Sequence, residues 1–145
     1  MLDLRELPSH VARAIEARRV HLEECRSRAG LYTVGLSRLQ GHPEILVRAL
    51  DDELYAKVTS VLVSHVLAGV RYHPGTFEVL GMPARMVALT QAEIAQHMPM
   101  FSAAASHPPA ALQIVLAENG QWPWDAGGPA GDLLAFPPWR LKGDA

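Results

Sequence analysis

Hydrophobic residues recur at helical spacing in two segments of the chain. After Pro8, which suits the first turn of a helix, Val11 and Ile15 fall on one face of a helix expected to end near residue 19. A longer stripe has apolar residues at positions 54, 58, 61, 62 and 66, between an acidic run at 51–53 and Gly69. Acidic residues favour a helix start and glycine favours a left-handed end, so this stripe predicts a long helix from about residue 52.

Apolar and polar positions alternate elsewhere, which predicts strands at residues 20–27, 31–36, 44–50, 77–80, 84–89 and 112–116. Turn residues at 28–30, 81–83 and 119–120 predict hairpins, and the segment 121–125 is expected to return after the last turn. Thr90 and Glu93 form a capping-box pattern, so a short helix should follow to about His97. The sequence therefore predicts an α+β fold, a mostly antiparallel sheet of hairpins with the long helix on one face and two shorter helices.

The chain of 145 residues is expected to form a single domain. It divides into an N-terminal helix (1–19), a core (20–125) and a tail rich in glycine and proline (126–145). The tail carries four large apolar residues, Leu133, Leu134, Phe136 and Trp139. The core of a single small domain has little room for these side chains, so we predict that they pack against a second copy of the chain in a homodimer.

The charge balance, the single cysteine and the lack of targeting segments disfavour nucleic-acid-binding, secreted and membrane proteins. Thirteen basic and fifteen acidic side chains give a formal charge of -2, which provides no basic surface for nucleic acid or an anionic membrane. The lone Cys25 cannot form a disulfide within the chain. It is more readily explained as a small apolar core residue than as a reactive thiol. The N-terminus lacks a secretory pattern, and the apolar region 58–70 is too short to span a membrane. These features predict a cytoplasmic protein.

His42 and Glu44 are the first candidates for chemistry. In an extended segment, residues two apart point the same way at roughly 6.5 to 7 Å, so this pair suits acid–base catalysis. Alternatively, His42 satisfies a turn while Pro43 fixes the start of a strand, and Glu44 lies at the edge of a pocket. The second interpretation is favoured because no third member of a triad is identifiable. It predicts that Glu44→Gln costs little stability.

Metal and cofactor sites are not expected. Three histidines directly precede proline: His42, His73 and His107. Their imidazoles could converge on a zinc ion, which is the alternative interpretation. Their spacing matches no short zinc motif. The sequence contains no G-x-S-x-G elbow and no glycine pattern for nucleotide phosphates. We therefore predict no metal and no cofactor.

Trp122 and Trp124 flank a proline after the last predicted turn. The two indoles either form an exposed aromatic surface that binds a ligand or pack at one end of the hydrophobic core. Because each indole can bury a large area, packing in the core is favoured. The arm is expected to pack close to the segment 42–44. On this interpretation Trp124→Ala should cost roughly 3 to 5 kcal/mol.

Several short motifs together resemble the bacterial family called domain of unknown function 4262. They are YTVGL at 32–36, GHPEI at 41–45, GVRY at 69–72 followed by PG at 74–75, LQIV at 112–115, Gly120 and WPWD at 122–125. The resemblance covers roughly residues 31–125 and implies no activity, substrate or catalytic residue. It marks six residues as matching the pattern: Tyr32, Thr33, His42, Glu44, Arg71 and Trp124. His73 and His107 are not among them, and residues 20–22 differ from the aromatic Gly-Trp often found before the first strand.

Two functions follow from these residues. The favoured one is a non-catalytic domain whose small-molecule or protein partner binds near Tyr32, Thr33, His42, Glu44, Arg71, Trp122 and Trp124. The alternative is a small hydrolytic enzyme that uses His42 and Glu44, and the sequence leaves open whether any reaction is catalysed. An enzyme needs a concave pocket where one of these two side chains meets another polar group, such as Tyr32 or Arg71, with water largely excluded. A flat or filled site would favour binding.

Overall fold

A computed structural model describes residues 2–25, 30–47, 53–105, 108–117 and 122. The helices are the 3-10 turn η1 (Leu4–Glu6), α1 (Ser9–Glu16), α2 (Leu36–Gln40), α3 (Glu53–Leu67), α4 (Gln91–His97) and α5 (Pro99–Ala104). The strands are β1 (His21–Glu24), β2 (Leu31–Val34), β3 (Glu44–Val47), β4 (Gly75–Val79), β5 (Met82–Ala88) and β6 (Ala111–Leu116).

The six strands form one sheet in the order β1-β2-β3-β6-β5-β4. Every neighbouring pair is antiparallel except β3 and β6, which run parallel, so the predicted α+β fold with a mostly antiparallel sheet is confirmed. The parallel pair places the first residues of two strands side by side, with Glu44 opposite Ala111. A polar side chain at the start of β3 therefore lies beside the segment that leads into β6.

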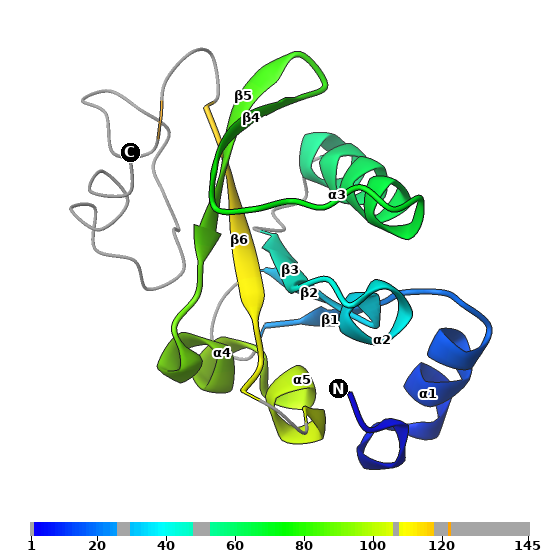
Figure 1. The fold of residues 1–145 in the computed structure, drawn as a ribbon. Coiled ribbons are helices and arrows are strands. Elements are labelled where there is room, and N and C mark those ends of the chain that lie inside the picture. Colours follow the sequence, from blue (N-terminus) through cyan, green and yellow to red (C-terminus); the bar gives the residue numbers. More distant parts are fainter. Residues whose placement is uncertain (1, 26–29, 48–52, 106–107, 118–121, 123–145) are drawn as a thin grey trace.

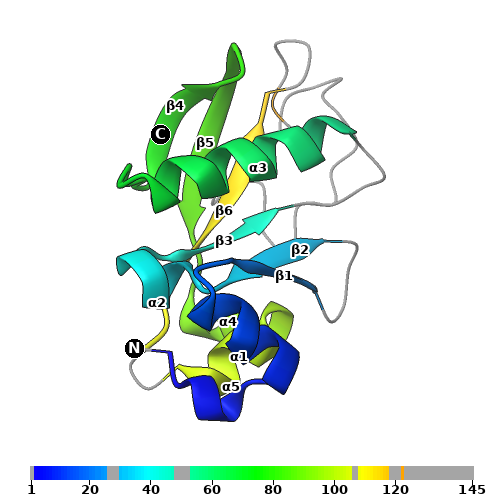
Figure 2. The same cartoon turned by 90° about the vertical axis from the view of Figure 1, so that its right-hand side faces the viewer.

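Each face of the sheet is covered by helices (Figures 1 and 2). On one face, α3 packs Val58, Leu62 and Val66 against strand residues that include Ile45 and Ile114. On the other face, α1, α4 and α5 pack against strand residues that include Leu46 and Val115. Successive residues of a strand point to opposite faces, which explains why neighbours such as 45 and 46 enter different cores. The long helix covers one face as predicted.

Local sequence signals locate several elements correctly. Thr90 accepts a hydrogen bond from the backbone N–H of Glu93, and the Glu93 side chain accepts one from Thr90, so the capping box is present. The hairpins β1–β2 and β4–β5 also form. Two α-helices were not predicted: α2, which follows Gly35, and α5, which begins with Pro99 at its first position.

The turn between β4 and β5 differs from the predicted one. It lies at Leu80 and Gly81, which both have positive φ (51° and 76°), whereas Met82 and Pro83 belong to β5. Such two-residue turns match the twist of a hairpin but favour asparagine or glycine at their first position. Leu80 is also 51% exposed, so its side chain gains little from burial.

Leu80→Asn is therefore expected to raise the free energy of unfolding by roughly 1 kcal/mol, because leucine in this conformation is strained and asparagine tolerates it. Urea denaturation measures the change. Leu22→Asn, at an exposed leucine of β1, is the matched control and should not stabilise the protein. Equal effects of the two substitutions would contradict the prediction.

Candidate functional site

The carboxylate of Glu44 lies beneath the N-terminus of α2. β2 ends at Val34, and Gly35, with φ of 133°, turns the chain into the helix. A side chain at Gly35 would be strained by this φ, and its Cβ would lie 3.2 Å from Ile15. The sharp turn aims the first backbone N–H groups of α2 at the first residue of β3.

Five hydrogen bonds converge on the two carboxylate oxygens. The donors are the hydroxyls of Thr33 (2.8 Å) and Ser37 (2.7 Å) and the backbone N–H groups of Gly35 (3.1 Å), Leu36 (3.1 Å) and Ser37 (3.0 Å). Helix N-termini leave such N–H groups without intrahelical acceptors and attract negative charge. Glu44 thus replaces the missing acceptors of α2 and joins β2, α2 and β3.

The sequence-based placement of Glu44 was wrong. Its side chain is 0% exposed, so it is a buried acceptor rather than a carboxylate at a pocket edge. Burial raises the pKa of the Glu44 carboxyl, while hydrogen bonds from Ser37, Thr33 and Gly35 oppose that rise. The reason for expecting Glu44→Gln to cost little stability is therefore removed, because water cannot reach the five donors to replace a lost acceptor. A large cost is now the prediction.

Two other candidate residues also have structural partners. The hydroxyl of Thr33 accepts a hydrogen bond from the backbone of Ile45 (2.8 Å) in addition to donating to Glu44. The hydroxyl of Tyr32 accepts one from the backbone of Met100 (3.2 Å). Both side chains are fully buried, so they connect the sheet to its surroundings.

The ring of His42 is buried and uses both nitrogens. The backbone N–H of Tyr72 donates to Nε2 (2.9 Å), which fixes Nε2 as an acceptor and leaves Nδ1 to donate to the Pro43 carbonyl (2.7 Å). Burial lowers the pKa of His42, the Pro43 carbonyl opposes this, and Arg71 and His73 lower it further. The imidazole is therefore neutral and holds the chain after α3 against the turn before β3.

Arg71 strengthens the same connection. Its guanidinium donates to the carbonyls of Gln40 (3.5 Å) and Gly41 (3.2 Å), and the Gln40 side chain donates to the Leu67 carbonyl (3.1 Å). Among the described residues, no carboxylate forms an ion pair with Arg71. The exposed cation is thus held in position by neutral acceptors.

A pocket of about 480 Å³ lies beside His42, and we call it the His42 pocket. It is lined by residues from five parts of the chain: Leu2, Ser37 with residues 41–43, Arg71, Phe101 with Ala105, and residues 108–110. Most of this lining is apolar, and Arg71 supplies the charge. The volume suits a small molecule.

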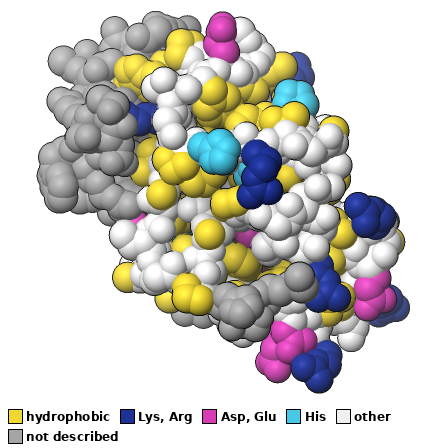
Figure 3. Space-filling model, in the orientation of Figure 1, with side chains coloured by type: hydrophobic (Ala, Val, Ile, Leu, Met, Phe, Trp, Pro, Cys, Tyr) yellow, Lys and Arg dark blue, Asp and Glu magenta, His cyan; other side chains and the backbone are white. Residues whose placement is uncertain are grey.

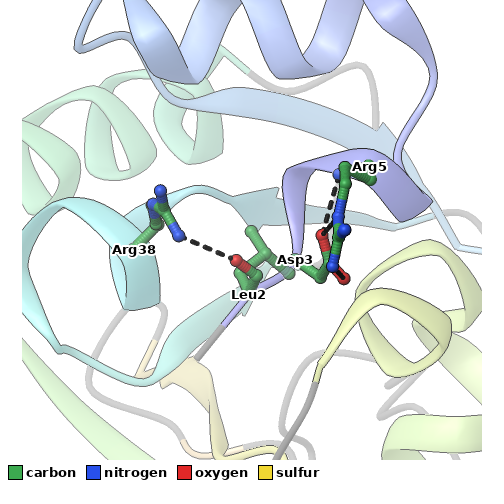
Figure 4. Close-up of polar contacts among 4 residues, drawn as sticks. All are labelled: Leu2, Asp3, Arg5 and Arg38. Carbon is green, nitrogen blue, oxygen red and sulfur yellow. Dashed lines mark hydrogen bonds and ion pairs between the residues drawn. The ribbon is translucent and has the colours of Figure 1, made fainter.

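The N-terminal wall of the pocket is fixed by backbone contacts. Arg38 of α2 donates to the Leu2 carbonyl (3.3 Å), and the backbone of Asp3 donates to the Ala104 carbonyl (2.8 Å). Figure 4 shows Arg38 reaching Leu2, while Arg5 folds back onto Asp3. Sequence analysis missed Leu2, Ser37 and Phe101 because apolar and hydroxyl side chains carry no motif for a pocket.

A second cavity, of about 350 Å³, lies between α3 and the β1–β2 hairpin. Its lining includes Leu22, Leu31, Val47 and Tyr55, with hydroxyl side chains along α3. It shares no lining residue with the His42 pocket, and none of the sequence-predicted site residues lines it.

The remaining candidates lie elsewhere or outside the described residues. Trp122 packs partly buried against the core on the side of α1, α4 and α5, and it does not line the His42 pocket. Trp124 and His107 lie outside the described residues. Burial raises the pKa of Cys25 to about 11, which disfavours the reactive thiolate.

Within the described residues, no three His, Cys, Asp or Glu side chains are arranged to hold a metal ion. The three-histidine alternative is weakened further because both ring nitrogens of His42 already have partners. Absence of a metal from the protein stays a prediction.

The family model named Domain of unknown function (DUF4262) matches residues 12–129. The chain belongs to the DUF4262 family. This match includes Ser37, His42 and Arg71 of the pocket but not Leu2. No curated protein and no solved structure matches the chain. In the part of this DUF4262 chain that the structure describes, no helix has the length and apolarity needed to cross a membrane.

The lowered pKa of His42 predicts a pH dependence for this DUF4262 protein. The unfolded chain, with an ordinary histidine pKa of about 6.5, binds the proton more tightly, so stability is lost as pH falls below that value. Urea denaturation between about pH 8 and about pH 5 should show a smaller loss for His42→Asn than for the unmodified protein. His10→Asn, an exposed histidine of α1, is the control. Equal losses in the unmodified protein and His42→Asn would contradict the prediction.

Proposed function

We propose that this DUF4262 chain is a non-catalytic domain that binds a small molecule in the His42 pocket. The observation that carries the proposal is a pocket of about 480 Å³, mainly apolar, with one preorganised cation. Binding sites for small molecules combine such apolar walls with a few fixed polar groups. A cytoplasmic location, a protein partner and a homodimer through residues 126–145 stay predictions.

The His42 pocket brings His42 and Arg71 together, as an enzyme would need, but the hydrogen bonds of the two candidate catalytic residues favour binding over hydrolysis. A general base needs a free lone pair within reach of the substrate. Nε2 of His42 accepts from Tyr72, and Nδ1 faces the Pro43 carbonyl. Glu44 is fully buried, and its oxygens accept from α2 and Thr33. Either residue would have to break its internal bonds to act on a substrate.

A pocket-filling variant tests the proposal. Ala110 lines the pocket and is exposed, so Ala110→Phe adds bulk without removing a buried side chain. We expect small molecules found by protein-detected NMR to shift the backbone amides of Gly41 and Ala105, and this binding to be lost in Ala110→Phe. Ala103→Phe, an exposed alanine of α5 outside the pocket lining, is the matched control and should bind normally.

Two results would count against the proposal. One is a screen in which no compound shifts the pocket amides, or in which Ala110→Phe binds as well as the unmodified protein. The other is hydrolysis of a nitrophenyl ester that disappears in a folded His42→Asn variant. That second result would restore the hydrolase alternative.

A further inference from the structure

Arg71 gives the mouth of the His42 pocket a positive charge that has no carboxylate partner among the described residues. Of the five N–H donors of its guanidinium, two are used by the Gln40 and Gly41 carbonyls. The remaining donors are available to a bound molecule. Because backbone carbonyls position the guanidinium, a ligand would bind it without ordering a free side chain first.

The neighbourhood of Arg71 holds a second side chain that can carry positive charge when protonated. His73 follows two residues later and is exposed, and both residues lie close enough to His42 to disfavour its protonation. On the face that Figure 3 draws, a histidine and a basic side chain lie side by side near the centre, most of the acidic surface lies toward the edges, and a small acidic patch is visible below the pair. The buried carboxylate of Glu44 is covered by Ser37 and contributes no exposed negative charge.

The rest of the pocket lining is mainly apolar. Leu2, Phe101 and Ala105 line it together with the prolines at 108 and 109. Such walls favour a hydrocarbon or aryl group over a sugar or nucleotide, whose hydroxyl and amide groups would lose hydrogen bonds there.

We infer that the ligand of the His42 pocket is a small carboxylate with an apolar body, whose carboxylate binds the Arg71 guanidinium. This inference rests on the proposed binding function. Guanidinium and carboxylate form strong charge-assisted hydrogen bonds, and the hydrocarbon part fills the apolar wall.

A phosphate group fits the site less well than a carboxylate. Phosphate sites commonly combine several cations or a free helix N-terminus. Here the N-terminal N–H groups of α2 already donate to Glu44, and Arg71 is the lining residue that carries a fixed positive charge. The geometry therefore favours a singly charged ligand.

Matched probes test this inference on the isotope-labelled full chain. Hexanoate, hexanamide and hexyl phosphate share an apolar body and differ in the polar group. We expect hexanoate to shift the amides of Gly41 and Ala105 and to bind at least about tenfold more tightly than hexanamide. Arg71→Gln should weaken hexanoate binding about tenfold and leave hexanamide binding unchanged. Arg19→Gln, an exposed arginine away from the pocket, should change neither.

The outcomes separate this inference from the proposed function. Equal affinities for hexanoate and hexanamide, both lost in Ala110→Phe, would overturn the carboxylate inference and leave the binding function standing. Tighter binding of hexyl phosphate than of hexanoate would likewise overturn it. If none of the three probes shifts the pocket amides but the compound screen finds other ligands of the pocket, the carboxylate inference fails and the proposed function stands. If the screen also finds none, both fail. Hexanamide binding serves as the folding check for Arg71→Gln, because it needs the pocket but not the charge.

Discussion

Glu44→Gln is expected to lower the free energy of unfolding by about 3 kcal/mol. The carboxylate offers only acceptors to five donors, whereas the glutamine amide has one acceptor oxygen and one NH₂ donor. The hydroxyl groups can reorient, but whichever oxygen position the NH₂ takes, at least one backbone N–H of α2 loses its acceptor. A buried donor left without a partner costs about 1 to 3 kcal/mol, and the other bonds lose the strength that the charge supplied.

Glu78→Gln provides the matched control for this measurement. Glu78 lies on β4 with an exposed side chain, so the same substitution should change stability by no more than about 0.5 kcal/mol. Urea denaturation at neutral pH compares the two variants. If Glu44→Gln were as mild as Glu78→Gln, the carboxylate would not be the acceptor that holds α2 to the sheet.

Leu62→Ala is expected to destabilise the protein by about 2 to 5 kcal/mol. Leu62 lies in the middle of α3, is 0% exposed and packs in the core that α3 shares with the sheet. Alanine would leave a cavity between two rigid elements, and the surrounding side chains can fill such a cavity only in part. Denaturant midpoints and slopes give the change in free energy.

Leu22→Ala is the control, because Leu22 is 42% exposed and loses less contact on truncation. It should cost less than about 1 kcal/mol. A cost for Leu62→Ala no larger than that of Leu22→Ala would mean that α3 does not pack on the sheet as the structure describes. A far-ultraviolet circular dichroism spectrum of Leu62→Ala that is unchanged at low denaturant would show that the variant is folded before the denaturation experiment.

Elements with strong local patterns were predictable from the sequence. The apolar stripe of the long helix, the Thr90 capping box and the apolar positions 112, 114 and 116 that predicted β6 each arise from neighbouring residues. The energies that fix them, such as end capping and one-sided burial, act over a few positions. Boundaries were less accurate: the predicted strand at 31–36 ends at Val34, because Gly35 adopts a positive φ and α2 begins.

The candidate site was predictable only as a set of residues. Motif resemblance drew attention to His42, Glu44 and Arg71, but not to what each side chain contacts. The i, i+2 spacing suggested that His42 and Glu44 cooperate, whereas His42 bonds to Tyr72 and Glu44 bonds to Thr33 and α2. Trp124, expected to cover this segment, lies outside the described residues, so its predicted stability cost is still to be measured.

The sequence alone thus determined the fold class, the long helix, most hairpins and the family. Tertiary structure decided the rest: the burial of Glu44, the neutral tautomer of His42 and a pocket assembled from Leu2, Arg71, Phe101 and other separate segments. The physical reason is the range of the interactions. Periodicity and turn chemistry act between near neighbours, whereas burial, pKa shifts and pocket walls depend on groups that folding brings together from distant parts of the chain.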